Sequence, residues 1–162
     1  MPNLRPALRI FSRFPRFLHA TMLLTLTCTL FGCGSGAPFS IEPVSGKVTY
    51  SDGSLIRADR IVVQFVPQGV EAVGKDKAAA AMGDVNVADG TFAGLTTQNH
   101  NDGAIVGKHK VTVQAFRKGP GGIDEPIATV PAIYAKAKTT PLEEEVTSST
   151  NYFEIKIEKP RF

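Results

Sequence analysis

The sequence predicts an all-β protein, a sandwich or barrel made of about seven short strands. Three observations support this. Apolar residues recur with a period of two along most of the chain after residue 43, and clusters of glycine, proline and aspartate separate the alternating segments. No stretch of that region shows a convincing helical period of 3.6 residues.

The first two strands are expected at Val44–Tyr50 and Ile61–Val66. The first ends at Ser51–Ser54, where an Asp-Gly pair is typical of a tight turn. The second is apolar and β-branched on both faces, which favours a central strand, and Pro67 ends it. Gly46 lies inside the first strand and indicates a bulge or the close approach of another backbone.

The segment 68–83 has two interpretations. Its four consecutive alanines, Ala78–Ala81, favour a helix. A strand that leads into Asp84–Val87 agrees better with the neighbouring pattern. The turn at Ala88–Gly90 then precedes a further strand at Thr91–Leu95.

In the second half, polar residues at Gln98–Gly103 predict a loop, and Lys108–Phe116 predicts a strand. One face of this strand would carry Val111, Val113 and Ala115, and the other Lys110, Thr112 and Gln114. The glycine- and proline-rich segment Arg117–Pro126 is expected to be a loop, and Pro131–Tyr134 one helical turn.

Two strands are expected near the C-terminus. Leu142–Val146 is short, acidic and expected to be exposed. Tyr152–Glu158 has the clearest alternation in the sequence, with Phe153, Ile155 and Ile157 predicted to point inward.

The first thirty-two residues differ in kind from the rest of the chain. Four arginines precede any acidic residue, and the core of the apolar stretch, Ala20–Phe31, has eight apolar residues and four threonines. It is shorter than the roughly 20 apolar residues that a spanning helix needs. A basic segment followed by a short apolar one is typical of a secretory signal peptide, which we place at residues 1–32.

Leu30-Phe31-Gly32-Cys33 resembles the bacterial lipobox, in which a small residue precedes an invariant cysteine. The resemblance implies cleavage after Gly32, a diacylglyceryl group on the Cys33 sulfur and acylation of the new amino group. Phe31 is bulkier than the residue usual at that position. Residues 33–43 are expected to form a flexible tether, and several acyl chains on one cysteine would hold the protein stably at a membrane. The alternative is an ordinary signal peptide and a secreted soluble protein.

Removal of the signal would change the charge of the protein. Fourteen basic residues would remain against fifteen acidic ones, in a chain of 130 residues that suits a single domain. Cys28 would be lost, so no intramolecular disulfide could form. No basic cluster with interleaved aromatic residues remains, and we therefore expect no nucleic-acid partner.

The order of motifs in the mature region resembles carboxypeptidase-regulatory-like, transthyretin-like domains of small bacterial lipoproteins. The motifs that carry the resemblance are Val44–Tyr50 with Asp52-Gly53, the strand that ends at Pro67, Asp89–Phe92, Gly107–Val113, and the segment from Val130 to Ile155. The resemblance implies that residues 44–162 form a seven-stranded Greek-key sandwich of prealbumin type. It supplies no catalytic residues, and a fold of this kind does not fix a function.

The residues that could carry chemistry are few. His100, Asp102 and His109 are candidate metal ligands, although zinc needs three or four convergent ligands and two of these lie in one loop. Glu143–Glu145 would alternate between the two faces of a strand, which prevents the three carboxylates from converging. The sequence contains no nucleophile elbow, and we expect no catalytic residue and no cofactor.

Two functions of different classes follow. The first is a non-enzymatic lipoprotein of the cell envelope, exported and anchored through Cys33 in the cell membrane or outer membrane. It would contact protein or polysaccharide through the loops Gln98–Gly107 and Arg117–Ala128, since long loops on a rigid sheet commonly carry recognition. The alternative is a small metal-dependent hydrolase or metal-binding protein that uses His100, Asp102 and His109. A third, weaker alternative is a small-molecule binder with a groove in the sandwich.

Overall fold

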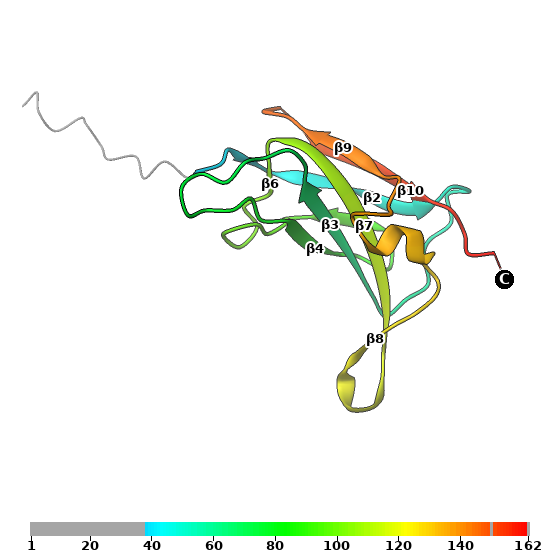
Figure 1. Cartoon of the computed structure of the whole chain (residues 1–162). Helices are drawn as coiled ribbons and strands as arrows, with labels where there is room; N and C mark the ends of the chain where they lie inside the picture. Colours follow the sequence, from blue (N-terminus) through cyan, green and yellow to red (C-terminus); the bar gives the residue numbers. More distant parts are fainter. Residues whose placement is uncertain (1–37, 150, 162) are drawn as a thin grey trace, which may run out of the picture. The chain divides into compact units, whose positions relative to one another are not determined.

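The computed structural model describes residues 38–149 and 151–161. The signal peptide and Cys33 lie outside these residues. In the described part the protein is all-β, as predicted, with one large curled sheet and one small sheet (Figure 1). The strands are β1 (Ile41–Glu42), β2 (Val44–Tyr50), β3 (Arg60–Pro67), β4 (Ala81–Val85), β5 (Thr91–Ala93), β6 (Ala104–Ile105), β7 (Gly107–Lys118), β8 (Asp124–Pro126), β9 (Glu143–Val146) and β10 (Asn151–Ile157).

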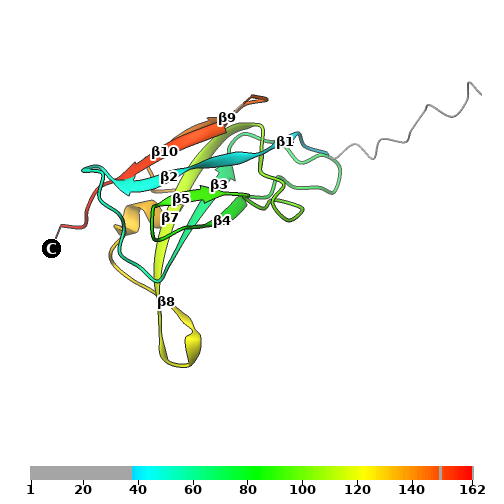
Figure 2. The ribbon, with the colours of Figure 1, turned by 180° about the vertical axis from the view of Figure 1, so that it is seen from behind.

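The large sheet has eight strands in the order β10-β2-β5-β4-β3-β7-β8, and β9 pairs with β7 as well. All its pairs are antiparallel except β10 with β2, which is parallel. The small sheet consists of β1 and β6. Figure 2 shows the large sheet from behind, with β5 beside β2.

β3 lies at the centre of the large sheet, as its apolar sequence predicts. It pairs with β4 on one side and, from Arg60 to Pro67, with β7 on the other. Val63 and Phe65 are completely buried. The consecutive residues Ile61–Val63 are all buried, so both faces of this part of the strand are shielded from water, in agreement with its nearly continuous run of β-branched residues.

The core is apolar and continuous, and it is formed by the inward-pointing residues of the large sheet. Phe65 lies at its middle, with ring centroids 6.2 Å from Phe92 and 5.5 Å from Phe153. The alternation predicted for the last strand is present, since Ile155 and Ile157 are buried while Tyr152, Glu154 and Lys156 are not. The predicted β7 face of Val111, Val113 and Ala115 is also buried, although Thr112 on the opposite face is buried as well.

The parallel pair of β2 and β10 gives the domain two distinct poles. Val44 lies beside Asn151 at one pole, and Tyr50 lies beside Ile157 at the other. A strand of seven residues spans about 20 Å at the usual rise per residue. The described chain begins at the first pole, which we call the N-terminal pole, and ends at the second, the C-terminal pole (Figure 1).

All seven expected strands are present, and the eighth strand of the large sheet corrects one expectation. The segment Arg117–Pro126 was expected to be a loop, but β7 continues to Lys118 and forms a hairpin with β8. A short 3-10 turn, η1 (Pro120–Gly122), connects the two strands. Gly121 and Gly122 have φ values of +75° and +79°, which is why glycine-rich sequence can form a hairpin tip here.

The strand interpretation of 68–83 is confirmed at its end by β4, and no helix forms at the alanines. Of the four alanines only Ala81 is buried against the core, where it begins β4, and Ala79 is exposed. The helical turn expected near Pro131 is present as the 3-10 turn η2 (Ala132–Ala135). In residues 38–149 and 151–161, no helix has the length and apolar character required to cross a membrane.

The expected tether, residues 33–43, needs correction at its C-terminal end. Phe39 is only 7% exposed, and Ile41 and Glu42 form β1 by pairing with β6. The ordered domain therefore begins before Val44. The apolar residues of this short segment, Phe39 and Ile41, explain why it joins the domain.

Candidate binding groove

Asp102 has a structural role in the loop that the sequence predicted. Its carboxylate accepts hydrogen bonds from the backbone N–H groups of Thr97, Gln98 and Asn99, at 2.7, 3.0 and 2.7 Å. Burial raises the pKa of Asp102, but these donors outweigh it and hold the pKa below its ordinary value. A carboxylate engaged in this way stabilises the loop.

The three candidate metal ligands do not form a common site. His100 is exposed in the loop, where its ring lies beside Asn101, whereas His109 is 1% exposed and points into the core. Within the ordered residues, no group of three or more histidine, cysteine, aspartate or glutamate side chains is placed to hold a metal ion. His100, Asp102 and His109 are therefore not placed to bind one metal ion together.

His109 is a buried neutral imidazole. Its Nδ1 lies 2.9 Å from the carbonyl oxygen of Gly107, to which it donates, and its ring contacts Phe65 edge-on with centroids 5.9 Å apart. Nε2 is buried and has no hydrogen-bond partner among the described residues. Burial lowers the pKa of His109 below 6.5, and the bond to Gly107 opposes this only in part.

We expect the free energy of unfolding to fall when the pH is lowered from about 7.5 to about 5.5. The folded state disfavours the proton on His109, so below the unfolded pKa of 6.5 the unfolded chain binds more protons than the folded one. The stabilising contribution is complete above that pH and is lost as the pH falls toward the folded pKa. Urea unfolding at both pH values measures the effect.

The variant His109→Phe should lose this pH dependence, while His100→Phe, at an exposed position, should keep it. Glu144 acts with the opposite sign at lower pH, because burial raises its pKa above 4.5 and protonation there favours the folded state. Repeating the titration with Glu144→Gln separates the two groups. An unchanged pH dependence in His109→Phe would assign the effect to another residue.

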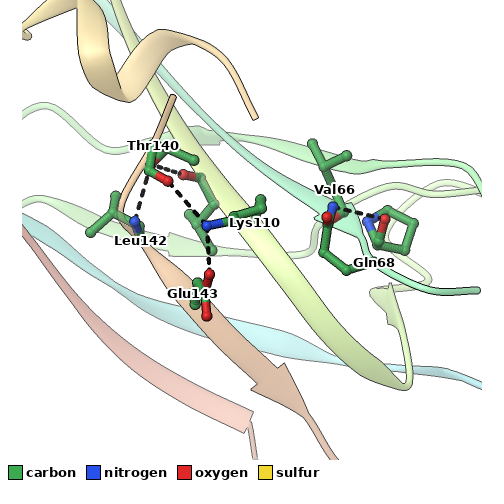
Figure 3. A network of polar contacts seen from close by, with 8 residues as sticks. Val66, Gln68, Lys110, Thr140, Leu142 and Glu143 are labelled. Atoms are coloured by element: carbon green, nitrogen blue, oxygen red, sulfur yellow. Dashed lines mark hydrogen bonds and ion pairs between the residues drawn. The ribbon is translucent and has the colours of Figure 1, made fainter. Parts of the chain in front are cut away.

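The acidic strand β9 behaves as the alternation predicts. Glu143 and Glu145 are exposed and Glu144 is half-buried on the other face, so the three carboxylates do not converge. Figure 3 shows Glu143 in an ion pair with Lys110, at 2.5 Å between Nζ and Oε1. The hydroxyl of Thr140 donates to the carbonyl oxygen of Val111 at 2.7 Å and fixes the chain as it enters β9.

A large hollow lies at the C-terminal pole. It has a volume of about 980 Å³ and opens between the loop that follows β2 and the segment that follows β10. Its lining residues are Tyr50, Ser54, Leu55, Ile56, Arg57, Ala58, Val87, Thr129, Lys159 and Pro160.

A second hollow of about 890 Å³ adjoins the first and shares Lys159 and Pro160 with it. It extends over η2 and the segment before it. Its other lining residues are Pro126, Ile127, Ala128, Val130, Pro131, Ala132, Ile133, Tyr134, Ala135, Glu158 and Arg161. We call the two hollows together the terminal groove.

Hydrogen bonds hold the wall of the terminal groove in place. The hydroxyl of Tyr50 donates to the backbone oxygen of Thr129 at 2.7 Å, and the hydroxyl of Tyr134 accepts from the backbone N–H of Glu158 at 3.1 Å. Burial raises the pKa of Tyr50, which keeps this phenol protonated. The end of β2 is therefore bound to the segment before η2, and η2 is bound to the C-terminal segment.

Lys159 contributes charge to the wall. Its ammonium group forms an ion pair with Asp52 at 2.5 Å and lies 5.4 Å from the centre of the Tyr50 ring. The hydrogen bond from Lys159 lowers the pKa of Asp52. Both side chains are about half exposed, so the pair orients Lys159 more than it stabilises the fold.

Sequence reasoning identified only one edge of this groove. The predicted contact loop Arg117–Ala128 supplies Pro126–Ala128, whereas Gln98–Gly107 supplies no residue to either hollow. The remaining residues come from four distant segments of the chain. The sequence feature that could have indicated the groove was Lys159-Pro160-Arg161, a basic and rigid segment directly after the last predicted strand.

No protein-family model matches this chain, and no curated protein and no solved structure matches it either.

Proposed function

We propose that the protein is an exported lipoprotein of the cell envelope that acts without catalysis, as a β domain anchored through Cys33 with the terminal groove as its binding site. The observation that carries this proposal is the sequence Leu30-Phe31-Gly32-Cys33 after a basic and then apolar segment. The ordered domain is described from residue 38 onward, a few residues after the cysteine.

The arrangement of the two poles supports a binding role. A chain anchored at Cys33 reaches the domain at the N-terminal pole, and the terminal groove lies at the other end of β2 and β10. The groove would then face away from the membrane that holds the lipid. Such an orientation suits contact with a soluble envelope component.

We also propose that the curled sheet belongs to the prealbumin type of Greek-key sandwich implied by the motif resemblance. Gly90 in the Asp89–Phe92 motif has a φ of +79°, and Phe92 is buried in the core. An aspartate-glycine turn that leads into an aromatic core residue is the feature on which the resemblance rests.

The anchor is tested by comparing the wild-type chain with Cys33→Ser after expression in a bacterium. The wild type is expected to be cleaved before residue 33, to carry the mass of the acyl groups and to sediment with membranes. Cys33→Ser should lose all three properties, whereas the matched variant Cys28→Ser should keep them, because that residue lies in the segment to be removed. Intact mass and membrane fractionation provide the measurements. A wild-type protein that is soluble and unacylated would contradict the proposal.

A further inference from the structure

We propose that the terminal groove binds an extended acidic peptide segment with apolar side chains, presented by another envelope protein. This inference deepens the proposed function and rests on it for the direction in which the groove faces. It is argued from the charge of the groove, its apolar surface and its position.

The charge of the terminal groove is positive. Arg57 lines the first hollow and Arg161 the second, and neither forms an ion pair with any residue that the structure describes. Lys159 lies between them, although Asp52 partly neutralises it. The one acidic lining residue, Glu158, already accepts a hydrogen bond from the hydroxyl of Ser51 at 2.7 Å. A carboxylate of a partner would therefore meet cations that have no competing ion pair.

The surface between these charges is apolar. Leu55 and Val87 beside the first hollow are 36% and 38% exposed, and Ile133 beside the second is 49% exposed. The hydroxyl of Thr129 is buried at the first hollow without a hydrogen-bond partner among the described residues. Apolar side chains of a partner would remove this surface from water, which favours binding.

The position and form of the groove favour a peptide over a lipid. Two hollows joined at Lys159 and Pro160 can receive side chains on either side of a carboxylate, as an extended segment presents them. The groove lies at the pole opposite the one at which the described chain begins. The wall is fixed by the hydrogen bonds of Tyr50 and Tyr134, so binding requires little ordering of the groove.

The test uses the mature, acylated protein, which begins at Cys33, in nanodiscs of neutral lipid. The probe is a fluorescein-labelled hexapeptide of alternating leucine and aspartate, and fluorescence anisotropy reports its binding. We expect saturable binding that weakens as salt increases, and much weaker binding of the same peptide with asparagine in place of aspartate.

The double variant Arg57→Gln/Arg161→Gln should raise the dissociation constant about tenfold. The matched control Lys75→Gln/Lys77→Gln removes the same charge from exposed residues outside the groove and should change it less than about twofold. Leu55→Ser should also weaken binding, which a purely electrostatic attraction would not predict.

Four results would overturn the proposal. The first is equal binding of the acidic and neutral peptides, and the second is equal effects of the two double variants. The third is displacement of the peptide by dodecanoate that binds more tightly than the peptide, which would assign the groove to an amphiphile. The fourth is sedimentation that shows a dimer broken by Arg57→Gln/Arg161→Gln, which would assign the groove to a second copy of the chain.

Acylation and peptide binding of the wild-type protein, measured on the same preparation, separate the two proposals. Peptide binding retained by an unacylated wild type would refute the anchor and leave the groove assignment in place. Absence of peptide binding by an acylated, membrane-bound wild type would refute the groove assignment and leave the anchor.

Discussion

Replacing Phe65 by alanine is expected to lower the free energy of unfolding by about 3–5 kcal/mol, the range found when a buried phenylalanine is truncated. Phe65 is fully buried at the centre of β3, and its ring contacts Phe92, Phe153 and His109. These partners come from three other strands, so no single segment can move inward to fill the space. Urea unfolding followed by far-ultraviolet circular dichroism measures the loss, since the chain contains no tryptophan.

Two variants calibrate the Phe65 result. Phe65→Leu keeps most of the volume and should cost less than about 2 kcal/mol. Tyr152→Ala removes an aromatic side chain that is 56% exposed on β10 and should cost less than about 1 kcal/mol. A Phe65→Ala protein as stable as Tyr152→Ala would show that the core is not organised around this ring.

Replacing Gly46 by alanine is expected to cost about 3 kcal/mol or more, at the upper end of the range for overpacked sites. Gly46 lies in β2 between Phe153 of β10 and Phe92 of β5. An added Cβ would overlap the backbone oxygen of Phe153 and would lie 2.7 Å from the Phe92 ring. A backbone oxygen in a paired strand cannot rotate away, so β10 itself would have to shift.

Gly119→Ala provides the matched control for Gly46→Ala. A Cβ at Gly119 would also meet a close neighbour, but that neighbour is the carboxylate end of the Glu125 side chain, which is flexible. We expect this substitution to change the free energy of unfolding by less than about 1 kcal/mol. If the two glycine variants unfold at the same urea concentration, close approach of the backbone is not the role of Gly46.

The strands were predictable because their signals are local. Val44–Tyr50 matches β2 at both ends, since the Asp-Gly turn after Tyr50 and the alternation before it act over a few residues. Of the two structural roles predicted for Gly46, a bulge or the close approach of another backbone, the structure shows the close approach. The hairpin of β7 and β8 was missed because its glycines and prolines predict a turn without showing that the strands on either side of it pair.

The terminal groove could not be predicted from the sequence in the same way. Tyr50 and Lys159 meet only because β10 pairs in parallel with β2 and brings the segment after β10 beside the end of β2. The sequence gives no indication of that partner or its direction. His109 shows the opposite problem, since its residue type suggested a ligand, whereas its position on the inner face of β7 makes it part of the core.

The pairing of β2 with β10 also determines when this protein can fold. The two strands are more than one hundred residues apart in sequence, and β10 is the last strand of the chain. A nascent chain still lacking residues 151–157 leaves one edge of β2 without its partner, so the native sheet cannot close before these residues have been synthesised. Pairings this distant also make folding slow, on the scale of milliseconds to seconds. The complete chain therefore passes through a period in which all its strands have been synthesised but the native sheet has not yet closed.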